Sequence, residues 1–310
     1  DPTPTEVITE MKRVADWQLA HPTKWKVTEW HQAPFYLGLF NLQQVSGEAK
    51  YMDALKGFGE ACQWGPGPIV THADDHAVLQ SFLEVGVQEK DQAKIAKVAG
   101  HFPKILAALK DKPAGSIAGG SFTWCWCDAL YMSPPVWVQL SNITGDPGYR
   151  DWAIREWWTT TDQLYDPQHC LYYRDNRFFP KLTETGKKVF WSRGNGWVVG
   201  GLVHVLNYLP ADHPDRSRFL GLYHDMMFAL LKLQHADGLW RSSLLECDGP
   251  NGESSGTAFF TYAMAWGLNR GLLPADTFRP AVLKGWRALC GNIQPTGMLG
   301  FVQRVDDGPA

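Results

Sequence analysis

The sequence predicts an all-α fold, an (α/α)6 barrel of helical hairpins, on three observations. Apolar residues recur with the helical period through most of the chain, beginning with Val7, Met11 and Val14. Glycines and prolines stand where such helices should end, as at Gly145. The 310 residues contain no low-complexity linker and no visible repeat, which favours one domain over residues 1–310 and disfavours a solenoid of near-identical units.

The helical pattern divides into eleven predicted helices. Their approximate ranges are 5–21, 31–46, 50–63, 74–89, 91–110, 127–144, 147–165, 194–209, 214–235, 255–270 and 276–291. Short segments that could form small hairpins are 170–174, 188–191, 238–242 and 298–303. A barrel of helical hairpins carries its longer loops at one rim, where a cleft forms, so the functional residues are expected in those loops.

Composition excludes two classes of function. Lys plus Arg is 29 and Asp plus Glu is 32, a net charge of −3, without the basic excess of a nucleic-acid-binding protein. No run of about 18 apolar residues is present, so no membrane span is expected.

The first residues and the cysteines bear on localisation. The chain begins at Asp1 without an initiator Met, as after removal of a signal peptide, so we expect a periplasmic or secreted protein, with the cytoplasm as the alternative. Buried free thiols are expected, and disulfides only if the protein is exported. The six cysteines are Cys62, Cys125, Cys127, Cys170, Cys247 and Cys290.

Aromatic residues are abundant, with 15 Trp, 15 Phe and 10 Tyr. Flat aromatic rings suit the apolar faces of sugars, and so many Trp residues exceed what a core of this size needs. For the whole set we favour an aromatic-lined cleft. A Trp-rich helical core is the alternative for any single residue.

Segment 190–197, Phe-Trp-Ser-Arg-Gly-Asn-Gly-Trp, is the densest group of candidate functional residues and lies just before a predicted helix. Arg193 stands between Trp191 and Trp197 in the sequence. A planar guanidinium binds a carboxylate through two parallel hydrogen bonds, so Arg193 suits a carboxylate clamp. The alternative is an arginine packed in the turn where the helix begins.

Asp128 is the candidate proton donor. It follows Trp124 and Trp126 and opens a predicted helix, where an Asp often serves only as an N-cap. An Asp beside two Trp residues would be partly desolvated, which raises its pKa and suits it to donate a proton near neutral pH.

The segment His72-Ala73-Asp74-Asp75-His76 concentrates carboxylates and imidazoles at another helix start. One Asp is expected to cap the helix and the other to face the cleft. The spacing matches no zinc-binding helix motif, so no metal is expected. The chain has no Gly-x-Ser-x-Gly elbow and no Walker or dinucleotide fingerprint, so no cofactor is indicated.

Segment 191–197 resembles the Trp-x-Arg-Gly-Asn-Gly-Trp signature of glycoside hydrolase family 105, which holds unsaturated rhamnogalacturonyl and related unsaturated glucuronyl hydrolases and is related to family 88. Residues 126–132 are similar to the family's Trp-x-Asp-x-Leu-(Tyr/Phe)-Met segment, which carries its catalytic Asp. The resemblance implies that Asp128 and Asp75 are catalytic. It implies substrate binding by Trp30, Trp126, Trp191, Arg193, Trp197, Trp240 and Arg174.

Two departures from the family pattern stand out. Many members carry a His-Gly pair where this chain has Tyr173-Arg174-Asp175, so the subsite for the sugar beyond the cleaved bond is expected to differ. Members usually end with a further helix beside the first. This chain stops at Ala310, so that last helix is expected to be missing or trimmed.

The activity that the resemblance implies is removal of a terminal 4,5-unsaturated uronic acid by hydration of its vinyl ether. The substrate would be an unsaturated oligosaccharide from pectin, ulvan or a similar polysaccharide. Asp128 would protonate C4, Asp75 would hold a hydroxyl or the water, and its charge would help to keep Asp128 protonated. The alternatives are a hydrolase or epimerase of saturated sugars on the same barrel, and a non-catalytic sugar-binding protein.

Overall fold

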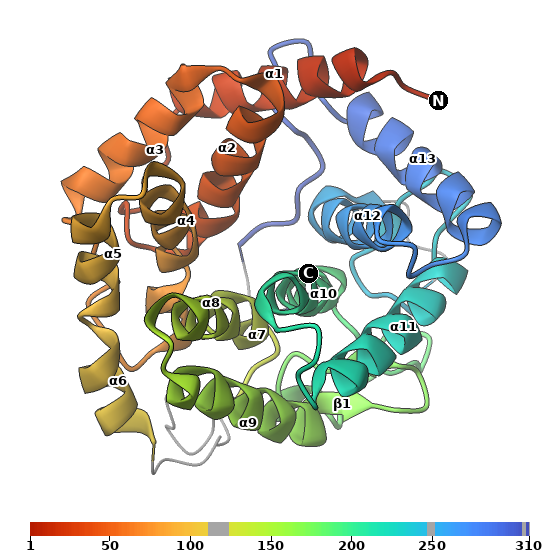
Figure 1. Ribbon diagram of the computed structural model, residues 1–310. Helices are drawn as coiled ribbons and strands as arrows, with labels where there is room; N and C mark the ends of the chain where they lie inside the picture. The colour runs from red at the N-terminus through yellow and green to blue at the C-terminus, as the bar shows by residue number, and fades with distance from the viewer. Residues whose placement is uncertain (111–123, 247–251, 306–307, 310) are drawn as a thin grey trace. The chain divides into compact units, whose positions relative to one another are not determined.

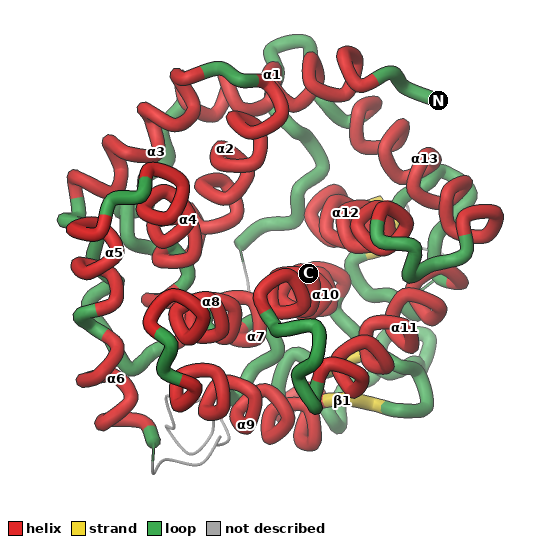
Figure 2. Tube along the Cα trace, viewed as in Figure 1, coloured by secondary structure: helices red, strands yellow, loops and turns green. Residues whose placement is uncertain are grey.

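Helices make up most of the computed structural model, which describes residues 1–110, 124–246, 252–305 and 308–309 (Figures 1 and 2). The α-helices are α1 (Pro4–Ala20), α2 (Ala33–Ser46), α3 (Ala49–Ala61), α4 (Leu79–Glu89), α5 (Gln92–Ala99), α6 (Phe102–Leu109), α7 (Ala129–Met132), α8 (Pro134–Thr144), α9 (Pro147–Leu164), α10 (Ser192–Tyr208), α11 (Arg216–Lys232), α12 (Ser254–Asn269) and α13 (Ala275–Gly291). The 3-10 helices are η1 (Trp30–Gln32), η2 (Ala73–His76) and η4 (Asn176–Phe178). The strands are β1 (Tyr165–Asp166), β2 (Leu171–Tyr172), β3 (Trp240–Arg241) and β4 (Gly252–Glu253).

The chain forms two compact units. The first unit comprises residues 1–113, 132–154 and 296–298, and the second comprises 114–131, 155–295 and 299–310. The first unit therefore holds α1 to α6 and α8, and the second holds α7 and α10 to α13. The single domain predicted from the sequence stays a prediction.

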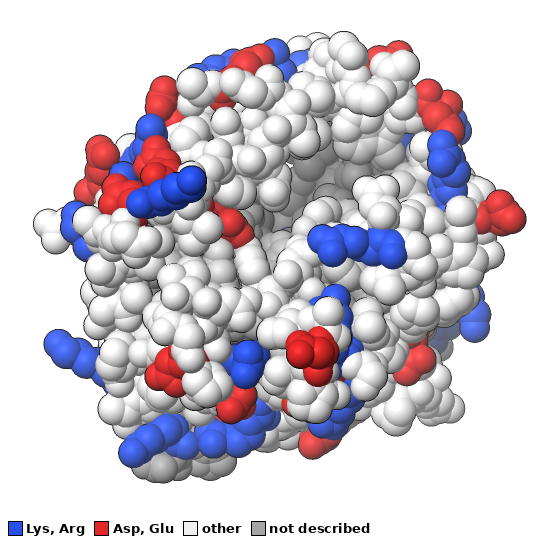
Figure 3. All heavy atoms as spheres, viewed as in Figure 1, with Lys and Arg blue, Asp and Glu red and all other residues white. Residues whose placement is uncertain are grey.

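In the first unit, local sequence signals set the helix ends. Thr3 and Glu6 form a reciprocal capping box at the start of α1. Gly47 ends α2 with a φ of 70°, a left-handed conformation that glycine adopts without a steric penalty. Acidic and basic side chains lie together over the α3–α5 region (Figure 3), where Lys56 pairs with Glu89. Exposed pairs of this kind contribute little to stability, so packing holds the unit together.

In the second unit, α10 packs closely on its neighbours because its first half is rich in glycine. A Cβ at Gly196 would approach the Phe259 ring of α12 to 2.9 Å. A Cβ at Gly201 would lie 2.2 Å from the carbonyl oxygen of Leu130 in α7. The strands form two short antiparallel ribbons, β1 with β2 and β3 with β4.

Most predicted helices are confirmed within a few residues, but three are wrong in extent. In the predicted helix 74–89, the first residues belong to η2 and α4 begins only at Leu79. The predicted helix 91–110 is divided into α5 and α6, because Gly100 ends α5 and Pro103 starts a new helix. The predicted helix 127–144 is likewise divided into α7 and α8 at the Pro134-Pro135 pair. Among the predicted strand segments, 170–174 contains β2 and 238–242 contains β3, whereas 188–191 and 298–303 form only isolated bridges.

Two further features bear on the sequence predictions. No helix in the described part of the chain is both long and apolar enough to cross a membrane. The described cysteines are all free thiols, and Cys125 and Cys127 are buried. Cys247 and the residues at 306–307 and 310 lie outside the described residues.

The contact between α10 and the backbone of α7 predicts the effect of adding one methyl group. We expect Gly201→Ala to lower the free energy of unfolding by about 1–3 kcal/mol, since the new Cβ meets main-chain atoms that cannot rotate away. Denaturant unfolding measures this value. The matched control is Gly221→Ala in α11, where no atom lies within 4 Å of the new Cβ, and which should stabilise the protein by about 0.5–1 kcal/mol. Equal effects at both positions would contradict the close contact.

Candidate active site

Asp128 follows residues 124–127, and backbone groups at both ends of this segment form hydrogen bonds to other parts of the chain. The backbone N–H of Cys127 donates to the carbonyl of Arg174 (2.8 Å). The hydroxyl of Thr160 on α9 donates to the carbonyl of Trp124. The position of Asp128 at the start of α7 is therefore set by backbone groups, and the residue is only 7% exposed.

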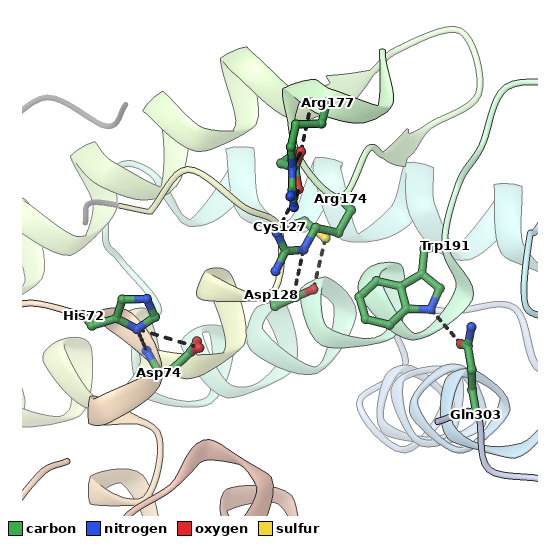
Figure 4. Close-up of polar contacts among 9 residues, drawn as sticks. His72, Asp74, Cys127, Asp128, Arg174, Arg177, Trp191 and Gln303 are labelled. Atoms are coloured by element: carbon green, nitrogen blue, oxygen red, sulfur yellow. Dashed lines mark hydrogen bonds and ion pairs between the residues drawn. The ribbon is translucent and has the colours of Figure 1, made fainter. Parts of the chain in front are cut away.

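The carboxylate of Asp128 has two polar neighbours in the second unit (Figure 4). The thiol of Cys127 donates to Oδ1 (3.4 Å), and Oδ2 lies 3.3 Å from Nε of Arg174. The carboxylate oxygens thus face a thiol and a guanidinium, whereas the alternative of a helix cap would direct them to the first N–H groups of α7. Arg174 was expected near the substrate, and its contact with Asp128 was not foreseen.

Burial dominates the electrostatics of Asp128. It raises the pKa of Asp128 above the usual range, against the opposing effects of Arg174, Cys127 and Arg193. Burial also raises the pKa of Cys127 well above its ordinary value, so this thiol stays protonated and can donate. Burial therefore favours the protonated form of Asp128, which is the form that a general acid needs.

Behind Arg174 lies a fully buried carboxylate that sequence reasoning missed. Oδ2 of Asp175 accepts hydrogen bonds from Nη1 of Arg174 (2.8 Å) and Nη2 of Arg177 (2.8 Å). Its Oδ1 accepts from Nε and the backbone N–H of Arg177, each at 2.9 Å. Burial works to raise the pKa of Asp175, but the bonds from Arg177 and Arg174 outweigh it and lower the pKa. The sequence does contain a signal for this cluster, because Arg174 directly precedes Asp175 and Arg177 follows it by two residues.

Arg193 and Trp191 bind a segment far along the chain. Nη1 and Nη2 of Arg193 donate to the carbonyls of Gln303 (2.9 Å) and Arg304 (2.6 Å). The indole N–H of Trp191 donates to Oε1 of Gln303 (2.7 Å; Figure 4). The Arg193 guanidinium lies 4.7 Å from the Trp191 ring centroid. Binding of a substrate carboxylate by Arg193 stays a prediction. The structure offers a second role for Arg193, which is to hold the backbone of residues 303–304.

Asn195 explains one position of the family signature in structural terms. Its buried side-chain amide accepts a hydrogen bond from the N–H of Tyr172 (2.8 Å) and donates to the carbonyl of Tyr172 (3.0 Å). It also donates to the carbonyl of Trp191 (3.0 Å). One amide therefore ties β2 to the start of α10.

In the first unit, Asp75 is a half-buried carboxylate in η2. Its carbonyl accepts from the N–H of Gly67 (2.9 Å), and a Cβ at Gly67 would overlap the Asp75 carboxylate. Burial raises the pKa of Asp75 to about 6; a backbone bond from Ile69 lowers it and the charge of Glu29 raises it. The prediction that Asp75 acts together with Asp128 stays a prediction.

The two histidines of the same segment form local hydrogen bonds. Nδ1 of His72 accepts from the backbone N–H of Asp74 (3.4 Å), so the cap of η2 is His72 and the prediction of an Asp cap is wrong. His76 is buried, and its two ring nitrogens contact Ser133 Oγ and the Val70 carbonyl, each at 2.7 Å. Across the described residues, no three His, Cys, Asp or Glu side chains gather as a metal site. The metal independence of the enzyme stays a prediction.

Most of the tryptophans form core, which corrects the expected aromatic-lined cleft. Ten of the 15 Trp side chains are buried. Trp240 is fully buried, and its indole N–H donates to the carbonyl of Leu230 (2.8 Å), which places it in the core; its contact with substrate stays a prediction. Trp197 lies between Tyr131 and Phe259 with ring centroids 4.8 and 4.7 Å away.

The remaining tryptophans predicted at the substrate differ in exposure. Trp126 and Trp191 are buried in the second unit. Trp30 in η1 is partly exposed and stacks on His31 with 3.8 Å between ring centroids. Contacts of these three with substrate stay predictions.

The chain is similar to known carbohydrate-active proteins over nearly its whole length. An unsaturated 3S-rhamnoglycuronyl hydrolase from Formosa agariphila is 37% identical over 321 aligned residues, 98% of this chain and 84% of that protein. A solved glycosyl hydrolase family 88 structure from Bacteroides vulgatus has a TM-score of 0.89 at 28% identity and covers 100% of this chain and 92% of its own. A structure described as a polysaccharide lyase has a TM-score of 0.88 at 29% identity, with coverages of 98% and 89%.

These similarities confirm the predicted fold class, since the chain shares the (α/α)6 barrel of its structural neighbours. The model of the family described as Glycosyl Hydrolase Family 88 matches residues 5–309. A match of that extent, together with the 37% identity to the Formosa agariphila enzyme, shows that this chain belongs to glycosyl hydrolase family 88.

Proposed function

We propose that this protein removes a terminal 4,5-unsaturated uronic acid from oligosaccharides that polysaccharide lyases generate. The observation that carries the proposal is Asp128, a buried carboxyl whose pKa is raised by burial. Its setting within a family 88 chain, 37% identical to an unsaturated 3S-rhamnoglycuronyl hydrolase, supports the same reaction class.

The proposed reaction is hydration of the vinyl ether between C4 and C5. Asp128 donates its proton to C4, and the positive charge that forms at C5 is shared with the ring oxygen. Water adds to C5 while the Asp128 carboxylate accepts a proton from it, which restores the acid. The resulting hemiketal opens to a ketone, and the hemiacetal left at C1 expels the leaving sugar. One water is consumed, and no second carboxylate attacks the anomeric carbon, unlike retaining or inverting glycosidases.

Within this class, we propose that the leaving sugar is rhamnose. The support is the name of the 37% identical relative, an unsaturated 3S-rhamnoglycuronyl hydrolase. Arg174 in place of the family's His-Gly pair also supports a subsite that differs from that of other members. Unsaturated glucuronyl-rhamnose should therefore be a better substrate than an unsaturated disaccharide with another leaving sugar.

A second candidate function is a polysaccharide lyase, because the structure with a TM-score of 0.88 is described as one. The two activities change ultraviolet absorbance in opposite directions. A hydrolase of this kind removes the double bond conjugated to the carboxylate, so the absorbance falls. A lyase creates that double bond in a saturated polysaccharide, so the absorbance rises.

The first prediction tests the reaction and the acid together. Wild-type protein should lower the absorbance of unsaturated glucuronyl-rhamnose, and Asp128→Asn should lose at least about 10²-fold in rate, because an amide cannot cycle a proton. The matched control is Asp162→Asn, whose side chain is 73% exposed and which should keep the wild-type rate. A rise in absorbance with a saturated polysaccharide would favour the lyase.

The second prediction separates the two roles of Arg193. We expect Arg193→Lys to raise KM to a similar extent for the unsaturated uronate and for its uncharged methyl ester, since Lys cannot bridge the carbonyls of Gln303 and Arg304. A loss confined to the charged substrate would instead establish Arg193 as the carboxylate clamp.

The third prediction concerns the pH profile. The pKa of Asp75 is raised to about 6, so this group is neutral below that pH and charged above it. If its carboxylate takes part in catalysis, kcat/KM should rise through about pH 6 as Asp75 ionises. In Asp75→Asn this rise near pH 6 should disappear, because an amide does not ionise. A rise that persists in this variant would assign it to another group.

A further inference from the structure

Arg174 has one tight partner and one loose partner. Its Nη1 lies 2.8 Å from the buried Oδ2 of Asp175, within the usual range for a charge-assisted bond. Its Nε lies 3.3 Å from Oδ2 of Asp128, and this is a single long contact where arginine and carboxylate often form two short ones. The contact with Asp128 is therefore the one that a competing carboxylate can replace.

The contact also opposes the chemistry proposed for Asp128. A general acid must carry a proton, whereas an adjacent guanidinium favours the ionised carboxylate and typically lowers its pKa by about 1–3. The groups that act on Asp128 from the surrounding second-unit segments are the Cys127 thiol, Arg174 with Asp175 behind it, and Arg193 of α10. Arg193 donates to the backbone carbonyls of Gln303 and Arg304, whereas Arg174 contacts the Asp128 carboxylate through Nε.

We propose that the carboxylate of the unsaturated uronic acid replaces Asp128 as the partner of Arg174, and that Asp128 takes up a proton as it is replaced. This inference rests on the proposed function and names the group that recognises the substrate's charge. The proton comes from the solvent and goes to Asp128. Arg174 stays protonated, Asp175 stays ionised, and no carbon bond changes in this step.

The buried partner of Arg174 suits it to such an exchange. Asp175 accepts a hydrogen bond from Nη1 of Arg174 and three hydrogen bonds from Arg177, so the guanidinium keeps its place when its other partner changes. The side chain of Arg174 is 14% exposed, so part of it remains open to a ligand. A uronate brings a planar carboxylate, the shape for which an arginine fork is suited.

The exchange has a kinetic consequence that can be measured. The pH dependence of kcat/KM reports ionisation in the free enzyme, and that of kcat reports ionisation in the substrate complex. If binding removes the influence of Arg174, the fall in kcat at high pH should lie about 1–3 pH units above the fall in kcat/KM. Between these two pH values, KM should rise about tenfold per pH unit.

The experiment compares these two profiles for the unsaturated glucuronyl-rhamnose and its methyl ester, with wild-type protein and Arg174→Gln. We expect the separation only with the charged substrate and wild-type protein. In Arg174→Gln it should shrink below about half a unit, because Asp128 then meets no guanidinium in the free enzyme. The matched control is Arg218→Gln, which removes an exposed arginine of α11 and should keep the full separation.

Three results would overturn the inference: no separation in wild-type protein, an equal separation with the methyl ester, or an unchanged separation in Arg174→Gln. If Arg174→Gln fails to fold, the comparison of acid and ester in wild-type protein decides alone. Turnover without any separation contradicts this inference only. Absence of turnover with every unsaturated substrate contradicts the proposed function.

Discussion

The backbone hydrogen bond from Cys127 to the carbonyl of Arg174 joins the residue before the candidate acid to the residue that supplies its cation. Asn195 extends this connection, since its amide binds both backbone groups of Tyr172 and the carbonyl of Trp191. Main-chain and amide groups thus tie three segments that are distant in the sequence. Because these bonds carry no ionisable group, Asp128 can gain or lose a proton without loosening the framework that places it beside Arg174.

The helices were predictable where the apolar spacing stops at a helix-end signal. They were less predictable where the apolar spacing continues past the end of a helix. Ile95, Val98, Phe102, Ile105 and Leu109 are all buried and follow one helical face across the break between α5 and α6. Periodicity cannot detect a break that leaves the buried face in register. Pro103 was the visible signal, since proline is tolerated in the first turn of a helix and disfavoured in its interior. Interruptions between two helices that share one buried face must be inferred from the positions of proline and glycine.

The candidate site was predictable where its environment is local in sequence. The pKa of Asp128 is raised by burial, and the neighbouring Trp124 and Trp126 in the sequence had predicted that burial. The partners of Arg193 lie 110 and 111 residues away, so no spacing rule identifies them. Trp240 shows a second limit of sequence-based prediction. An indole ring can stack on a sugar or pack in a hydrophobic core, and amino-acid composition does not distinguish these two roles.

The charges around Asp128 give a physical reason for coupling proton uptake to binding. Arg174, Arg177 and Arg193 contribute three positive charges, and Asp128 and Asp175 contribute two negative ones when ionised. A bound uronate adds one negative charge to this group, and a proton taken up by Asp128 adds one positive charge. The sum is then the same before and after binding, so the buried cluster need not absorb a change in net charge, which is costly in a poorly solvated site. The substrate's own charge thereby makes the protonated form of Asp128 the favoured one at the moment when the reaction needs it.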